Sequence, residues 1–153
     1  MTDGEPSLAP AAVVLTQVAV PEVVAAACAG ERIEVDVAPT AIGCVAVLRS
    51  PAGDAPQAAA RVISRSLART GTPAVLLVQR DGRMEASMWR AGAPERTLAP
   101  GLALEGTPAE VEGILLGTTS VADLAGVVTS AGVGRLGALR MVARGLRRGR
   151  RVS

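Results

Sequence analysis

Two short apolar runs, residues 42–48 and 74–78, place the strongest constraint on how this chain folds. Because they carry almost no polar side chain, they predict β-strands that are covered on both faces of a sheet. The length of 153 residues fits one domain, which buries enough surface for a core of its own. The chain therefore needs helices that cover a sheet.

The rest of the first half alternates strand and helix signals. Residues 13–18 are rich in β-branched side chains, and 32–37 alternate apolar with charged residues, which is typical of a strand with one solvated face. Pro21 suits the first turn of a helix, and Asp54 suits a helix N-cap. The expected elements are strands at 13–18, 32–37 and 42–48, and helices at 21–30 and 54–69.

The second half opens with a hairpin signal. Asp81-Gly82 favours the positive φ angles of a tight turn between strands 74–78 and 84–90. Prolines and glycines then predict a connecting loop from residue 93 to about 106. Capping patterns favour a helix at 107–117 and another from 120 to about 132. A last helix is expected from Arg135.

The predicted order is β-α-β-β-α-β-β followed by C-terminal helices. This order indicates a single α+β domain with an antiparallel or mixed sheet, and its first six elements match a ferredoxin-like arrangement. The expected organisation is a flexible N-terminus (1–10), an α+β core (11–92), a loop with two helices packing on that core (93–134), and an Arg-rich amphipathic helix and tail (135–153).

The side-chain inventory argues against most enzyme classes. The chain has no His, Lys, Phe or Tyr, and Trp89 is its single aromatic residue. Ser-His-Asp triads, Cys-His and Ser-Lys dyads, Schiff bases, imidazole zinc sites and the P-loop lysine are therefore excluded, which leaves carboxylates as the remaining acid/base groups. Cys28 and Cys44 lie among apolar residues and are expected to be buried free thiols. The sequence predicts no catalytic residue, no cofactor and no metal, and hence a non-enzymatic protein.

Two further patterns in the sequence lack the context that their usual functions require. Residues 132–137 spell G-x-G-x-x-G, but a helix is expected before them, whereas a dinucleotide site follows a strand. The segment ahead of Cys28 has no basic residue, so it does not resemble a signal peptide. A cytoplasmic location is the resulting expectation.

Charge is unevenly placed along the chain. Residues 1–134 hold nine Arg and fourteen acids, whereas 135–153 hold seven Arg and no acid. Leu136, Leu139, Val142 and Leu146 form an apolar stripe on the last helix, and arginines occupy much of the remainder. Either this stripe packs on the domain, or the helix contacts a partner. The candidate contact residues are Arg135, Arg140, Arg144, Arg147, Arg148, Arg150 and Arg151.

Two lesser candidates complete the predicted contact surface. Arg61, Arg65 and Arg69 follow one another at helical spacing and form a second basic row. Trp89 shares a strand face with polar residues, so it is either an interface anchor or covered by the C-terminal helices.

The sequence thus favours a protein-interaction module, acting as an adaptor or assembly factor, with the Arg-rich C-terminal helix as its contact surface. The alternative is a nucleic-acid-binding protein that contacts the phosphate backbone through the same arginines. An acidic protein surface is the expected partner; nucleic acid, an anionic membrane surface and a second copy of the chain are the other candidates.

Overall fold

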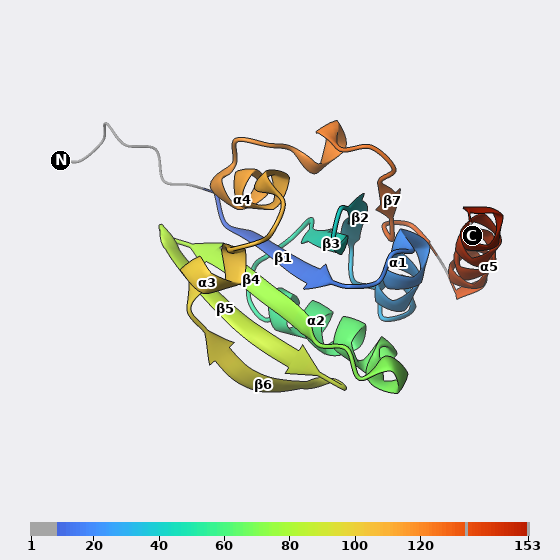
Figure 1. The fold of residues 1–153 in the computed structure, drawn as a ribbon, viewed down its shortest axis with the longest axis horizontal. Helices are drawn as coiled ribbons and strands as arrows, with labels where there is room; N and C mark the ends of the chain where they lie inside the picture. The colour runs from blue at the N-terminus through green and yellow to red at the C-terminus, as the bar shows by residue number, and fades with distance from the viewer. Residues whose placement is uncertain (1–8, 134, 153) are drawn as a thin grey trace.

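Seven antiparallel strands form one sheet with the spatial order β6-β5-β4-β1-β3-β2-β7 (Figure 1). The computed structural model describes residues 9–133 and 135–152, with the side chains of 135, 136 and 148–152 excepted. The strands are β1 (Ala11–Thr16), β2 (Val35–Thr40), β3 (Gly43–Leu48), β4 (Ala74–Arg80), β5 (Arg83–Arg90), β6 (Ala93–Leu98) and β7 (Val128–Thr129).

Helices lie on both faces of this sheet. They are α1 (Pro21–Gly30), α2 (Ala55–Ser66), α3 (Pro100–Leu104), α4 (Ala109–Leu116) and α5 (Arg135–Val152), with short 3-10 turns η1 (Ala68–Thr70) and η2 (Val121–Asp123). α1 and α2 cover one face, and α3 and α4 cover the other, while α5 lies on the outer side of α1 (Figure 1). The molecule is therefore a single α+β domain, as the sequence predicted.

The central strands are buried on both faces. β1 pairs with β3 and β4, and its neighbours Val13 and Val14 point to opposite faces while both are fully buried. The apolar runs 42–48 and 74–78 become β3 and β4, so the prediction of doubly covered strands is confirmed. Val, Ala and Leu fill most of this core, since the chain offers only one aromatic side chain.

The strand expected at 32–37 begins later and is not solvated on one side. Arg32 lies in the turn after α1, and β2 starts at Val35. Asp36 is buried and accepts two hydrogen bonds from the Arg49 guanidinium, at 3.0 and 2.8 Å. These hydrogen bonds, together with the carboxylate charge, raise the pKa of Arg49. The alternating sequence pattern predicts that Asp36 faces solvent. In the structure Asp36 instead forms a two-pronged ion pair with Arg49 at the sheet.

The loop expected from residue 93 to 106 contains a strand and a helix. β6 pairs with β5 as the edge of the sheet, and α3 follows it. The two-residue turn before β6 uses Ala91 at φ 52° and Gly92 at φ 88°, so one of its residues is not a usual signal for positive φ. β6 itself contains Pro94 and exposed charges, which an edge strand tolerates and which hide its strand character in the sequence.

The helix expected at 120–132 ends after one turn. The capping box is present, because Ser120 accepts from the Ala122 amide and Asp123 accepts from the Ser120 amide. The chain then extends to β7, which pairs with β2. The Ser130 hydroxyl donates to the Ile33 carbonyl at 2.6 Å and accepts from the Val35 amide at 2.8 Å. These contacts with the sheet edge favour an extended segment over further helix.

Candidate interaction surface

The Arg-rich helix α5 packs against α1 through small side chains. Ala138 of α5 is buried against Ala26 and Ala29 of α1, and Met141 and Val142 border this contact. The apolar surface shared by the two helices is narrow, because it is made largely of methyl groups. α5 is therefore held on the domain by a close approach of two helix backbones rather than by large side chains.

Gly145 shows how close that approach is. A β-carbon at this position would lie 2.6 Å from Val20 Cγ1 and 2.9 Å from Glu22 Cβ, closer than real contacts allow. Glycine inside a helix costs about 1 kcal/mol relative to alanine. Here that cost is offset by the packing that the missing side chain permits.

The apolar stripe predicted for α5 is only partly buried. Val142 is half-buried beside α1, but Leu139 is 69% exposed and Leu146 is 52% exposed. The side chain of Leu136 lies outside the described residues. The helix is rotated so that Ala138, Met141 and Gly145 face the domain, and the two leucines border the contact and face solvent. Of the two alternatives for this stripe, packing on the domain thus holds for Val142 and not for Leu139 or Leu146.

A shallow apolar hollow of about 500 Å³ lies between the two helices. Its walls come from one side of α1 and one side of α5, and Leu139 forms part of its rim. We call this region, with Leu146 and the neighbouring arginines, the α1–α5 surface. The residues that line the hollow are Val23, Ala26, Ala27, Gly30, Ala138, Leu139 and Val142.

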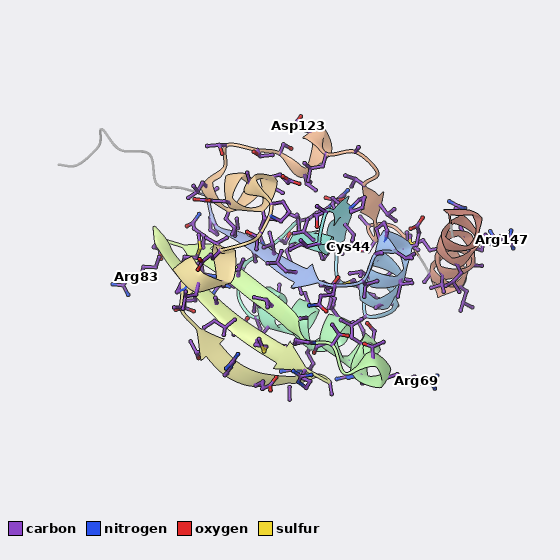
Figure 2. The ribbon with its side chains drawn as sticks, viewed as in Figure 1. Cys44, Arg69, Arg83, Asp123 and Arg147 are labelled. Carbon is purple, nitrogen blue, oxygen red and sulfur yellow. The ribbon has the colours of Figure 1, made fainter. Side chains whose placement is uncertain are left out.

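The arginines of α5 whose side chains are described face solvent. Arg140, Arg144 and Arg147 are exposed and share one side of the helix, since they are four and three residues apart. Figure 2 shows Arg147 pointing away from the body of the molecule. The ion pairs among the described side chains are Asp36–Arg49 and Arg90–Glu95, so none of these three arginines is paired with an acid of the described domain.

The remaining candidates on this helix are placed only by their backbone. Arg135, Arg148, Arg150 and Arg151 belong to α5, but their side chains lie outside the described residues.

The second basic row is split between two elements. Arg61 and Arg65 are exposed on α2, whereas Arg69 lies in η1, because the helix ends at Ser66. Figure 2 shows Arg69 projecting from the end of this turn. The structure thus places this row on the α2 side of the sheet, apart from the arginines of α5, whose helix packs on α1.

Trp89 is part of the core. It is 4% exposed, packs in the cluster beneath α1 and α2, and donates from Nε1 to the Ser87 hydroxyl at 2.9 Å. The alternative of a covered Trp89 is therefore correct as to burial, but the helical residues of its buried cluster come from α1 and α2 and not from the C-terminal helices that the sequence suggested. Trp89 is therefore not available as a surface anchor.

The two thiols are buried and unreactive in character. Burial raises the pKa of Cys28 to about 12 and that of Cys44 to about 11. A thiol with such a pKa is almost wholly protonated at neutral pH and is a poor nucleophile. Among the residues that the structure describes, no three His, Cys, Asp or Glu side chains are grouped so that they could hold a metal ion.

A second hollow of about 390 Å³ lies between the first turn of α2 and strands β4 to β6. Its polar groups include Gln57, Glu85, Ser87 and Thr97, and the Gln57 Oε1 atom is buried without a described hydrogen-bond partner. Glu85 is the one carboxylate among the residues that line this hollow.

Comparison with protein-family models, curated proteins and solved structures finds no match for this chain. Within the part of the chain that the structure describes, no helix combines the length and apolar character needed to cross a lipid bilayer.

Proposed function

We propose that this protein is a non-enzymatic interaction module, an adaptor or assembly factor, and that the α1–α5 surface is its contact site. One observation carries the proposal. α5 docks through its alanine and glycine side and leaves Leu139, Leu146 and a row of arginines facing solvent. Exposed apolar side chains beside unpaired charges are typical of a surface that a partner covers.

The surface favours an acidic, amphipathic helix as its partner. The hollow between α1 and α5 accepts apolar side chains at helical spacing, in the manner of a helix bound in a groove. Arg140, Arg144 and Arg147 then meet carboxylates along one edge of the bound helix. Such a partner removes both leucines from water and pairs the arginines.

Other macromolecules match this surface less well. The phosphate backbone of a nucleic acid pairs with arginines but leaves Leu139 and Leu146 in water, so it uses only half of the surface. Helices that bind membrane surfaces are commonly anchored by Trp or Phe, and the one aromatic residue of this chain is buried in the core. Nucleic acid and anionic lipid are therefore outcomes that the experiment must distinguish.

We also infer that residues 11–80 form a ferredoxin-like unit in a cytoplasmic protein. The central sheet order β4-β1-β3-β2, with α1 and α2 on one face, supports the fold assignment. The free thiols Cys28 and Cys44 support a reducing compartment.

Selection from a displayed library of random peptides tests the proposed site. The full chain serves as bait, and a Leu139→Ser, Leu146→Ser variant serves as counter-bait. Both leucines are exposed, so the variant is expected to fold as well as the parent chain. We expect peptides that bind only the parent chain, with apolar residues three and four apart and an excess of acids.

Matched variants on other surfaces are the controls. Ile42→Ser replaces an exposed apolar residue at a distant turn, and Arg61→Glu with Arg65→Glu reverses charge on α2. Selected peptides should bind these controls as well as the parent and lose affinity for Arg140→Glu, Arg144→Glu. Peptides that bind parent and counter-bait equally would show that the proposed site is wrong. A chain that binds duplex DNA or anionic vesicles and selects no peptide would show that the proposed partner is wrong.

A further inference from the structure

The large apolar side chains exposed on the described surface divide mainly between two regions. Leu139 and Leu146 belong to α5, and Leu102 and Leu116 belong to α3 and α4, with exposed fractions of 70% and 39% for the latter pair. Ile42, in the turn between β2 and β3, is the remaining one. A second region of this molecule thus exposes leucines as α5 does.

The segment that carries this second region is opposite in charge to α5, although exposed Arg96 of β6 lies on the same face of the sheet as Leu98. Residues 99–134 contain four acids and no Arg or Lys. Glu112 is exposed one helical turn before Leu116 in α4. Glu105 is exposed where the chain leaves α3. Neither glutamate forms an ion pair with a described side chain. We call this region, defined by Leu102, Glu105, Glu112 and Leu116, the α3–α4 surface.

The two surfaces cannot meet within one molecule. α3 and α4 cover the face of the sheet opposite α1 and α2, and α5 lies beyond α1 (Figure 1). In Figure 2 Asp123, on the α4 side, and Arg147 point outward from different parts of the molecule. Any contact between the surfaces therefore joins two copies through unlike patches, which is a heterologous contact.

We propose that the partner of the α1–α5 surface is the α3–α4 surface of a second copy of this chain. This inference rests on the proposed function, because it names the occupant of the same surface. Leu116 and Leu102 of one copy cover the hollow between α1 and α5 of the next. Glu105 and Glu112 pair there with arginines of α5. The α3–α4 surface supplies exposed leucines beside carboxylates, one leucine on each of two short helices, and this is the chemistry that complements the α1–α5 surface.

A head-to-tail contact leaves each copy with one free surface of either kind. Association therefore continues to longer chains of molecules unless the rotation between copies closes a ring. Because the paired charges are near the surface, salt weakens the association.

Sedimentation velocity on the full chain tests this inference. At low salt we expect the average mass to rise with concentration beyond that of a dimer, and to fall as salt is added. A chain that stays monomeric at low salt throughout a concentration series overturns the inference. The peptide selection described above is independent of that result, so failure of self-association leaves the proposed contact site to be judged separately.

Two variants, each altered on one surface, make the test specific. Leu139→Ser with Arg144→Glu disables the α1–α5 surface, and Leu116→Ser with Glu112→Arg disables the α3–α4 surface. We expect each variant alone to self-associate at least about tenfold more weakly than the parent chain. Mixed together, they should form a dimer that grows no further, because one intact surface of each kind is left. That dimer also shows that both variants are folded.

The control is Ile42→Ser with Arg61→Glu, which should associate as the parent chain does. Loss of association with the α5 variant but not with the α3–α4 variant means that the second copy binds elsewhere. That result overturns this inference and leaves α5 as a contact surface. Equal behaviour of both variants, the control and the parent chain overturns it as well.

Discussion

At the scale of single residues, the missing side chain of Gly145 decides how α5 sits on the domain. The atoms of Val20 and Glu22 occupy the space where a β-carbon would lie. The alanines on both helices extend the same close approach. Small residues therefore select the docking side of α5, and Leu139 and Leu146 are left exposed to solvent.

We predict that Gly145→Ala loosens α5, although alanine is the better helix former. Overpacking at such a contact costs about 1 to 3 kcal/mol, which exceeds the gain of about 1 kcal/mol in helix propensity. Limited trypsin digestion should cut faster after Arg140 and Arg144 than in the parent chain. Gly101→Ala is the control, because a β-carbon there meets open space and no positive φ opposes it. Equal digestion rates for Gly145→Ala and the parent chain would contradict the packing argument.

At the scale of elements, the sequence best predicts the strands at the centre of the sheet, which are buried on both faces. The doubly buried strands and the Asp81-Gly82 turn follow from local patterns, since burial and positive φ each require particular residue types. β6 is not predicted, because its side chains are exposed and show no apolar pattern. β7 is not predicted, because Ser130 holds it to the sheet through hydrogen bonds with residues distant in sequence.

The candidate site likewise has one feature that the sequence predicts and one that it does not. The basic face of α5 was predicted from helical spacing, because spacing alone determines which residues share a side. The side of α5 that docks on the domain was not predicted. Apolar periodicity favours large side chains such as leucine as the buried ones, whereas the docking side is formed by alanine and glycine. The four-residue spacing of Glu112 and Leu116 is the signal in the sequence that could have indicated the α3–α4 surface.

We predict that Ser130→Ala frees β7 from the edge of the sheet. The Val35 amide and the Ile33 carbonyl lose their partner, and an unsatisfied buried group costs about 1 to 3 kcal/mol. Hydrogen exchange should accelerate at the Val35 amide. Ser120→Ala removes an exposed cap and should cost about 1 kcal/mol or less. An unchanged exchange rate at Val35 in Ser130→Ala would refute the proposed role of the hydroxyl.

We also predict that a chain ending at residue 134 keeps its core. α5 contacts mainly the outer side of α1, so its removal leaves both large core clusters almost intact. Thermal unfolding followed by Trp89 fluorescence should stay cooperative, because that residue lies beneath α2 in the cluster that α5 barely touches. Loss of a cooperative transition would mean that α5 is needed for folding.

At the scale of the whole molecule, the side-chain inventory determines how stability responds to pH. Without His, Lys or Tyr, the side chains that titrate between pH 9 and 11 in the unfolded chain are Cys28 and Cys44. In the folded chain, burial raises their pKa values from 9.0 to about 12 and about 11. The folded state therefore holds these protons after the unfolded state has released them.

We predict that the free energy of unfolding is insensitive to these thiols below pH 9 and falls as pH rises from 9 to 11. Each thiol contributes a slope of up to about 1.4 kcal/mol per pH unit. Urea denaturation across this range measures the slope, and Cys28→Ala with Cys44→Ala should flatten it even though the variant is less stable overall. A slope that persists without the thiols would assign the loss of stability to other groups.

The two ends of the sheet limit how this protein can meet its neighbours. β6 ends one side with a proline and exposed charges, and β7 ends the other with only two residues. Neither edge offers a long, flat row of backbone groups to the strand of another chain. Growth of the sheet from one molecule to the next, the usual route to insoluble fibrils, is thereby discouraged. The self-association that we propose runs through helices, so it does not depend on these edges.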